Sequence, residues 1–369
     1  MCLRKRIVVA ALCVILTVAA ALQACPVSAL NFVTSGDYKF VINDDNSLYI
    51  YSYSGSDASI SLPLTVKNRV VKGIYANAFR NSKIKSVTIP DSYSYIGDFA
   101  FYKSVNLTAV ALPSNLESLG ESAFGSCSSL REIDLSAALG ISALPQGVFS
   151  KNTSLVSVAI PDHITSVGDS AFSGCTALSD IGWGSALTAV GSRAFEGCTS
   201  LEEVVFPNGL KSVGDYAFSN DTALWNVVIP PSVTALGEGC FMNDTDLEEL
   251  FLSYTVASIG ADCFAPMSYT GDITVTCYEN TNAARYCYNN QVKNLTLLSH
   301  KTGDANLSGE VDVMDVTAIQ KDNVGKVPIT DERARLLADV NGDGNVTVRD
   351  ATLIQMYVAK IITSFESLK

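Results

Sequence analysis

Histidine is almost missing from this chain of 369 residues, which contains only His163 and His300. A Ser-His-Asp site would need one of these two imidazoles, and neither lies in a nucleophile motif. The sequence also lacks a phosphate-binding loop and a zinc-binding signature. Acidic residues are plentiful but recur periodically, which favours a solvated face over the paired carboxylates of a glycosidase. The sequence therefore predicts a protein that is not an enzyme.

Basic residues are in the minority. The chain has 25 Lys and Arg against 37 Asp and Glu, for a net charge of −12. Residues 30–300 carry 14 basic and 26 acidic side chains, and residues 301–369 carry 8 and 11. Because an acidic surface repels phosphate groups, we expect neither nucleic acid nor anionic lipid as a partner.

Only the N-terminus holds a long apolar run, and its pattern is typical of a secretory signal. Residues 4–6 are basic, an apolar run from Ile7 to Leu22 follows, and small residues come next. The run is short for a membrane span, so we expect no transmembrane span in the mature chain. Cleavage after Ala29 would give a secreted, extracellular protein. Lipid attachment at Cys25 is the alternative, and the sequence does not decide between them.

A repeat of about 23 residues organises most of the remaining chain. Its anchor is a Phe, usually preceded by Ala or Cys. The anchor positions are Phe79, Phe101, Phe124, Phe149, Phe172, Phe195, Phe218, Phe241 and Phe264. Apolar residues recur five positions before the Phe, and Leu recurs six positions after it from Leu107 to Leu247. A fixed period of this length indicates stacked supersecondary units, none of which can bury its apolar face alone. The sequence therefore predicts a solenoid.

Each repeat contains a segment that alternates apolar and polar residues like a short strand, as at Val158 and Ile160, and that often ends in Pro. These residues resemble the BspA-like leucine-rich repeats of bacterial surface proteins, with the pattern L-x-x-V-x-I-P…V-G-x-x-A-F. The resemblance implies an α/β-type repeat solenoid that is β-rich and right-handed. The expected domains are a signal peptide (1–29), an N-terminal cap (30–78), the repeats (79–271), a C-terminal cap with a linker (272–300) and a C-terminal module (301–369).

Seven cysteines remain beyond Ala29, at spacings too irregular for a disulfide framework. Cys175 and Cys198 each follow an anchor Phe by three residues, whereas Cys240 and Cys263 each precede one. Since adjacent repeats stack, the members of each pair should lie close together. Buried thiols acting as small apolar side chains are the favoured interpretation, and the spacing does not suit a metal site. The sequence does not decide between thiols and disulfides.

The C-terminal module contains a different duplication. Two loops, 35 residues apart, place oxygen-bearing side chains at positions 1, 3, 5 and 12 and Gly at position 6. This spacing wraps a hard cation, and the Gly permits a sharp turn. We expect two calcium ions, held by Asp304, Asn306, Ser308, Glu310, Asp312 and Asp315 and by Asp339, Asn341, Asp343, Asn345, Thr347 and Asp350. Glu310 and Asn345 would contribute backbone carbonyls, and Asp312 and Thr347 would act directly or through water.

Both loops carry Asp instead of the Glu of EF-hands at position 12, and each runs into an apolar helix. They resemble type I dockerins, the calcium-dependent docking modules of cellulosome subunits. The resemblance implies a small all-α calcium-binding domain and a cohesin partner on a scaffoldin. The family's recognition positions correspond to Val313 and Met314 in the first copy and to Val348 and Arg349 in the second. Because these pairs differ, we expect one dominant docking orientation.

One outward-facing column of the repeats becomes apolar toward the C-terminal end. Its last members are Val205, Val228 and Phe251. Trp225 occupies a slot that polar residues mostly hold in other repeats, so its side chain should be exposed. We hypothesise that these four residues bind a partner. The alternative is that they pack under the C-terminal cap.

These features together predict a secreted, non-catalytic component of an extracellular polysaccharide-degrading complex. The C-terminal module would dock to a cohesin, and the repeats would bind a protein or a glycan. A bacterial cell-surface adhesin is the first alternative. A subunit with an unrecognised glycoside hydrolase activity is the second. The sequence identifies neither the ligand of the repeats nor the cohesin class.

Overall fold

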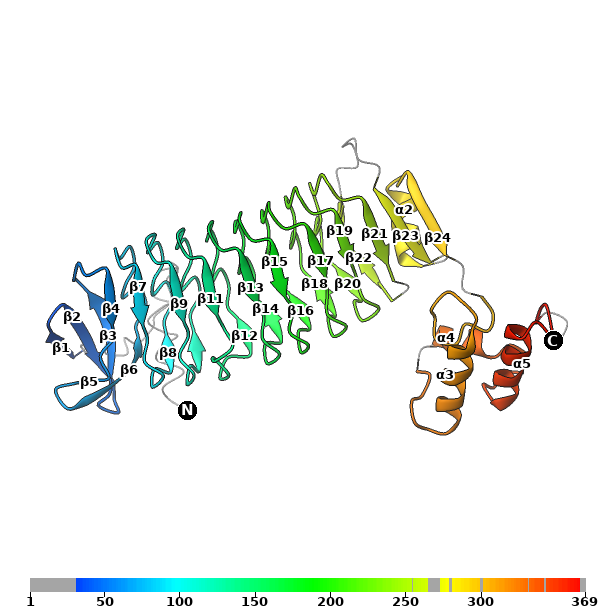
Figure 1. The fold of residues 1–369 in the computed structure, drawn as a ribbon, viewed down its shortest axis with the longest axis horizontal. Coiled ribbons are helices and arrows are strands. Elements are labelled where there is room, and N and C mark those ends of the chain that lie inside the picture. The colour runs from blue at the N-terminus through cyan, green and yellow to red at the C-terminus, as the bar shows by residue number, and fades with distance from the viewer. Residues whose placement is uncertain are drawn as a thin grey trace, which may run out of the picture.

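The computed structural model describes residues 31–253, 255–264, 273–278, 281–298, 301–330, 332–341 and 343–365. The predicted signal segment, with its two processing positions Cys25 and Ala29, lies outside the described residues. The described chain forms a β-solenoid followed by a small helical domain (Figure 1). The predicted β-rich repeat solenoid with an α-helical C-terminal module is therefore confirmed.

Strands of the N-terminal end form an antiparallel meander. It consists of β1 (Phe32–Ser35), β2 (Tyr38–Ile42) and β3 (Leu48–Tyr53). The third strand pairs in parallel with β6 (Arg69–Ile74), which leads into the first full coil. A short hairpin joins β5 (Thr65–Val66) to β6, and β4 (Ser59–Ser61) pairs with the first strand of the repeats.

The predicted strands line one side of the solenoid. They are β7 (Ser86–Thr88), β9 (Ala109–Ala111), β11 (Glu132–Asp134), β13 (Ser157–Ala159), β15 (Asp180–Gly182), β17 (Glu203–Val205), β19 (Asn226–Val228) and β21 (Glu249–Leu252). They pair in parallel within three sheets, and paired residues occupy equivalent repeat positions, as Val204 and Val227 do. In the three-residue strands the middle residue points inward, and its two neighbours point outward.

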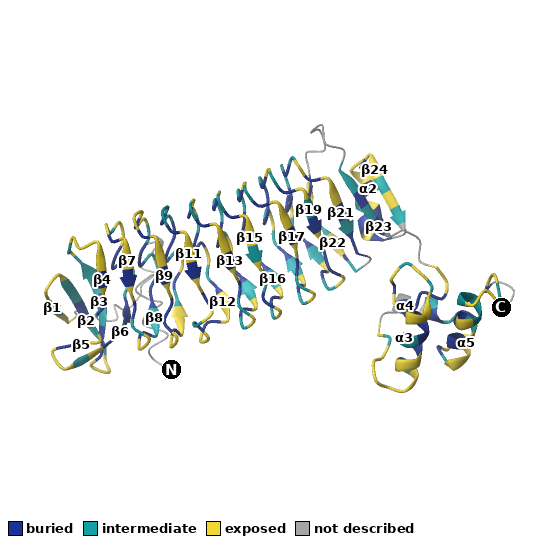
Figure 2. Ribbon diagram, in the orientation of Figure 1, coloured by how far each residue is buried: buried dark blue, intermediate teal, exposed yellow. Residues whose placement is uncertain are grey.

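A second set of strands lines the other side, and the sequence pattern did not predict it. Each has two residues and ends on the apolar position five residues before the anchor Phe. They are β8 (Tyr95–Ile96), β10 (Ser118–Leu119), β12 (Ala143–Leu144), β14 (Ser166–Val167), β16 (Ala189–Val190), β18 (Ser212–Val213), β20 (Ala235–Leu236) and β22 (Ser258–Ile259). The two sides enclose a continuous apolar core, as the burial colouring in Figure 2 shows.

The anchor Phe side chains stack ring on ring through this core. From Phe79 to Phe241 each is at most 1 % exposed. Centroids of adjacent rings lie between 4.9 and 5.9 Å apart. Burial of each ring contributes about 1.5–3 kcal/mol. The last ring of the series, Phe264, instead meets the edge of Tyr286 in the C-terminal cap, at 5.0 Å.

A column of buried polar groups runs beside the rings, three residues after each Phe. Its described members from the second coil on are Ser104, Cys127, Asn152, Cys175, Cys198, Asp221 and Asp244. The hydroxyl of Ser104 and the three thiols donate to the Phe carbonyl of the preceding coil. The Asn and the two Asp side chains accept a backbone N–H from the preceding coil. The column therefore ties each coil to its neighbour where apolar side chains could not.

A strand–helix–strand unit closes the C-terminal end. Strand β23 (Thr274–Tyr278) extends the sheet of β21, and β24 (Asn294–Leu298) pairs in parallel with β23. Helix α2 (Asn282–Asn289) connects them and begins at Thr281, whose hydroxyl accepts the N–H of Ala284. Its buried face covers the last coil, so the open end of the solenoid core is not left to solvent.

The helical domain has a hydrophobic core of its own. It consists of α3 (Val313–Asn323), α4 (Glu332–Ala338) and α5 (Val348–Val358). The first and last of these helices pack together through residues such as Ile319 and Ile354, both completely buried. Among the helices of the described residues, none is long and apolar enough to span a bilayer.

The two buried aspartates make a testable pair. Asp221 is fully buried and Asp244 is 9 % exposed. In each, Oδ1 accepts one backbone N–H, and Oδ2 is buried without a hydrogen-bond partner among the described residues. Burial raises the pKa of Asp221 well above its usual value, and the nearby carboxylates of Asp244 and Glu196 raise it further. Burial also raises the pKa of Asp244.

We expect Asp221→Asn to stabilise the solenoid at neutral pH by about 1–3 kcal/mol. Because the folded pKa lies above the unfolded value of about 3.9, the penalty is absent below that pH and grows as the pH rises through the folded pKa. Thermal unfolding from pH 4 to 8 should therefore show the gain at the neutral end only. Asp246→Asn, an equal charge change at an exposed site, is the control. Parallel pH profiles for wild type and Asp221→Asn would refute this account.

Candidate calcium and docking sites

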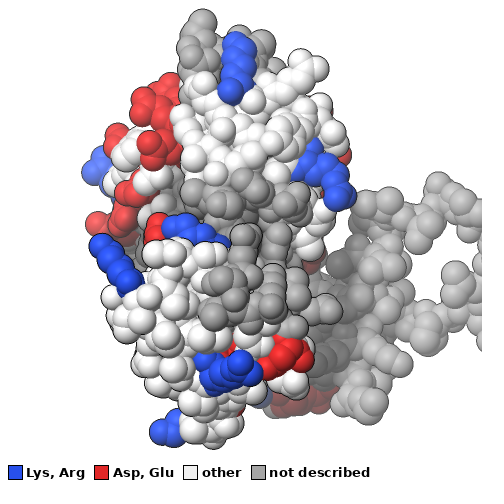
Figure 3. All heavy atoms as spheres, turned by 90° about the vertical axis from the view of Figure 1, so that its right-hand side faces the viewer, with Lys and Arg blue, Asp and Glu red and all other residues white. Residues whose placement is uncertain are grey.

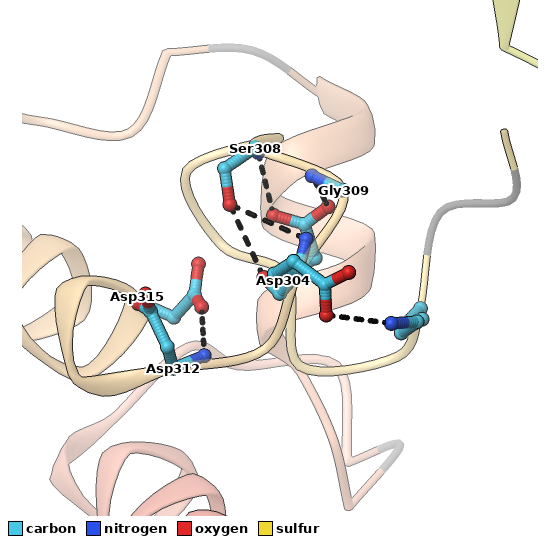
Figure 4. Close-up of polar contacts among 7 residues, drawn as sticks. Asp304, Ser308, Gly309, Asp312 and Asp315 are labelled. Carbon is cyan, nitrogen blue, oxygen red and sulfur yellow. Dashed lines mark hydrogen bonds and ion pairs between the residues drawn. The ribbon is translucent and has the colours of Figure 1, made fainter.

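The first loop of the helical domain is organised by two buried carboxylates. Asp304 accepts the backbone N–H groups of Ser308 and Gly309, both at 2.8 Å, through its two oxygens (Figure 4). Asp315, in the first turn of α3, accepts the N–H groups of Asn306 at 3.0 Å and Asp312 at 2.8 Å. Both carboxylates are completely buried. They fold positions 1 to 12 of the loop around a common centre.

The second loop repeats this arrangement. Asp339 accepts the N–H groups of Asp343 at 3.1 Å and Gly344 at 2.8 Å. Asp350, the equivalent of Asp315, accepts the N–H of Thr347 through Oδ2 at 2.9 Å. The Gly at position 6 has φ of +90° in the first loop and +84° in the second, which only Gly adopts without strain. The duplication in sequence is therefore a duplication in structure.

Electrostatics of the loops fit a hard cation. Burial raises the pKa of Asp315, although two backbone N–H groups act in the opposite direction. The second oxygen of Asp350, Oδ1, is buried and has no hydrogen-bond partner among the described residues. A buried carboxylate oxygen without a donor is costly unless a cation completes it. Among the described residues, no group of three or more His, Cys, Asp or Glu side chains is placed to hold a metal ion. A cation in these loops therefore also needs amide, hydroxyl and backbone oxygens as ligands.

The predicted ligands differ in how the structure uses their side chains. Glu310 turns its carboxylate to Lys301, at 2.8 Å, and leaves only its backbone carbonyl for the loop. Asp312 and Thr347 cap α3 and α5 by accepting the N–H groups of Met314 at 2.7 Å and Arg349 at 3.2 Å. Capping fixes where each helix begins and keeps these two side chains from pointing freely at a cation.

The predicted recognition residues open the two equivalent helices. Val313, Met314 and Val348 are 61 %, 57 % and 63 % exposed, and Arg349 is exposed as well. On the end of the molecule shown in Figure 3, the visible Lys and Arg side chains stand apart on mostly uncharged surface. The described residues of this end thus present no continuous basic surface.

The predicted solenoid patch is largely exposed. Val205, Val228 and Phe251 lie in one register across three neighbouring strands. Val205 and Val228 are 51 % and 40 % exposed, and Trp225 is 44 % exposed. Phe251 is half-buried, so it contributes less surface than we expected. The backbone of Trp225 is hydrogen-bonded to Glu202 on one side and to Glu248 on the other, which places an exposed indole between two exposed acidic residues.

Comparison with known families assigns both regions. The model of the BspA-type leucine-rich repeat region matches residues 72–191 and 174–296, in six copies. The model of the type I dockerin domain matches residues 302–359. Type I dockerin domains bind calcium and imply a cohesin partner, and neither matched domain is catalytic. Both domains are typical of extracellular or cell-surface proteins.

Several solved structures are similar to this chain. A leucine-rich cell surface protein from Faecalibacterium prausnitzii is 21 % identical to this chain. The match covers 76 % of this chain and 98 % of that protein, with a TM-score of 0.42. A leucine-rich repeat protein from T. pallidum is 25 % identical, and the match covers 59 % of this chain and 91 % of that protein, with a TM-score of 0.44. A leucine-rich repeat protein from Bacteroides ovatus is 19 % identical, and the match covers 73 % of this chain and 97 % of that protein, with a TM-score of 0.33. Among curated proteins, none matches this chain.

Loss of a loop carboxylate should weaken calcium binding. We expect Asp315→Asn to lower the calcium affinity of the first loop at least about tenfold in calorimetric titration of the full chain. Glu310→Gln is the matched control, because the Glu310 carboxylate faces Lys301, and its affinity should stay close to wild type. Chelation should lower the melting temperature of the helical domain and leave that of the solenoid unchanged, since the two cores are separate. If the titration shows no heat of calcium binding, the cation site is ruled out.

Proposed function

Because this chain belongs to the BspA-type leucine-rich repeat family and ends in a type I dockerin domain, we propose that it is a secreted, non-catalytic component of an extracellular polysaccharide-degrading complex, a cellulosome. The dockerin domain attaches it to a cohesin of the scaffoldin when calcium is bound. The repeats present a binding surface for a protein or a glycan. The observation that carries this proposal is the duplicated loop and helix with exposed residues at both helix starts.

Calcium couples the loops to the docking surface in this proposal. Position 12 of each loop, Asp315 or Asp350, lies in the first turn of a helix whose N-cap is position 9. A cation that holds position 12 therefore also holds the start of α3 or α5, where the recognition residues are. Two ions are proposed, one per loop, with the ligand sets predicted from the sequence. Removal of calcium releases the helix starts, and the cohesin loses its binding surface.

The two halves of the dockerin domain present unequal surfaces. The first offers Val313 with Met314, and the second offers Val348 with Arg349. Methionine adapts its shape to a partner and buries apolar area without desolvating a charge. We therefore assign the dominant docking orientation to the first half, with the second half bound weakly or not at all.

Titration of the full chain with a panel of type I cohesins tests the docking proposal. With calcium, one cohesin should bind tightly, and chelation should abolish the complex. The variant Val313→Ala with Met314→Ala should weaken binding at least about tenfold, and Val348→Ala with Arg349→Ala should change it little. Equal small losses in both variants would contradict a single orientation. Calcium binding with no cohesin partner would contradict docking and favour a surface adhesin.

The solenoid surface around Trp225 is the proposed site for the ligand of the repeats. It comprises Val205, Trp225, Val228 and Phe251, and exposed apolar groups of this size on a solvated sheet are costly unless a partner covers them. The exposed glutamates on either side give the site an acidic edge, which suits an uncharged or basic partner better than an anionic one.

Replacement of Trp225 and Phe251 by Ser tests this surface. Binding to soluble and insoluble plant polysaccharides should fall at least about tenfold, because an exposed aromatic anchor is lost. The matched control is Val156→Ser, which removes an apolar side chain that is 50 % exposed from the same repeat position three coils earlier. Circular dichroism should show that both proteins keep the fold. Unchanged binding in the Trp225 and Phe251 variant would dispose of the site.

A further inference from the structure

Four cysteines lie at the C-terminal end of the solenoid, and all four are completely buried. Cys240 and Cys263 occupy the same position in adjacent coils, and their sulfur atoms are 3.2 Å apart. Cys277 in β23 and Cys287 in α2 form a second pair, with their thiols hydrogen-bonded to each other. The repeat pattern predicts that the first two cysteines lie close together, but it does not predict the second pair.

The other three cysteines direct their thiols elsewhere. Cys127, Cys175 and Cys198 donate to backbone carbonyl oxygens of the preceding coil at 3.2, 3.2 and 3.4 Å. Cys175 and Cys198 are as deeply buried as the terminal cysteines and have the same separation in sequence as Cys240 and Cys263. Register alone therefore does not distinguish the two pairs. The difference lies in what each thiol contacts.

Local geometry favours a covalent bond between Cys240 and Cys263. Residues in the same register of adjacent coils lie close to the strand spacing of about 4.8 Å, within the Cα separation of about 4.4–6.8 Å that disulfides require. The N–H of Phe241 donates to the carbonyl of Cys263 at 2.7 Å and holds the coils in that register. The sulfur atoms need to approach by only about 1 Å to reach bonding distance.

We propose that Cys240–Cys263 and Cys277–Cys287 are sites of oxidative modification, where two disulfide bonds lock the C-terminal end of the solenoid. The oxidant belongs to the class of small-molecule or protein disulfides. In each pair one thiolate attacks the oxidant disulfide and releases one thiol, and the second cysteine then displaces the other half. Each pair of cysteine thiols thereby loses two electrons and two protons to become a disulfide, and each oxidant molecule is reduced to two thiols.

The hydrogen bond within the cap pair shifts the pKa values of its two thiols in opposite directions. The Cys287 thiol donates to Cys277 and lowers the pKa of Cys277. The same bond raises the pKa of Cys287. All four thiols are shielded in the closed structure, so the reaction takes place before the last coil closes or during its local opening.

The bridges lie where a solenoid is weakest. A terminal repeat has a neighbour on one side only, so opening begins at the ends. One bridge joins two coils, and the other joins the strand and the helix of the cap that covers them. The chain leaves this cap toward the dockerin domain, so tension from a docked scaffoldin enters through it. That mechanical consequence rests on the proposed function, whereas the oxidation chemistry does not.

The test uses the chain from residue 30 on, which holds seven cysteines, and oxidises the reduced protein with glutathione disulfide in a low concentration of denaturant. Intact mass should fall by four hydrogens, and alkylation followed by peptide mapping should locate the bonds. Four cysteines allow three pairings. We expect Cys240–Cys263 and Cys277–Cys287, with Cys127, Cys175 and Cys198 alkylated. A Cys263–Cys287 bond, a Cys175–Cys198 bond formed as readily, or seven alkylated cysteines would overturn the proposal.

Paired variants separate a specific lock from general thiol loss. Oxidation should raise the melting temperature of the wild-type solenoid by several degrees. The increase should shrink in Cys240→Ser with Cys263→Ser and persist in the matched control, Cys175→Ser with Cys198→Ser. An identical shift in all three proteins would also overturn the proposal. Cohesin binding, measured in the same samples, should not depend on oxidation. A failure of the docking proposal can therefore be told apart from a failure of the disulfide proposal.

Discussion

The stacked phenylalanine rings set the spacing of every other element in the solenoid. Their centroid separations of 4.9 to 5.9 Å are close to the distance between hydrogen-bonded strands. Ring packing and backbone pairing therefore require the same rise per coil, and a change in either would disturb both. Extra residues are tolerated only outside this register. The longest gap, between Phe124 and Phe149, is absorbed in an outer loop where Leu139 is 71 % exposed.

Local patterns explain which parts of the fold the sequence could predict. The three-residue strands, the ring register and the calcium loops each follow from residues at fixed separations. The two-residue strands such as Ser166–Val167 did not, because two residues cannot display an alternation. The Cys277–Cys287 contact lies outside the repeat period and depends on how α2 crosses β23. The exposure of Trp225 could be predicted because its slot is polar in most other repeats, whereas the partial burial of Phe251 depends on the neighbouring strand.

Buried carboxylates have opposite consequences in the two domains. In the solenoid, Asp221 and Asp244 each satisfy one oxygen with a backbone N–H and leave the other without a donor among the described residues. Burial raises the pKa of both carboxyl groups, so protonation is the means to relieve the cost. In the loops, Asp304 and Asp315 share their centre with amide, hydroxyl and backbone oxygens. There a bound divalent cation would relieve the cost.

Separate cores allow the two domains to change independently. The small core around Ile319 and Ile354 is separate from the core that contains the ring stack of the solenoid. Within the solenoid, inward positions are constrained by the stack, so only outward positions can vary at little cost in stability. Along the sheet side, these positions change from Ser86 and Thr88 near the N-terminal end to Glu203 and Val205 near the cap. A change of this kind has no structural cause in the core, which is why we locate ligand recognition there.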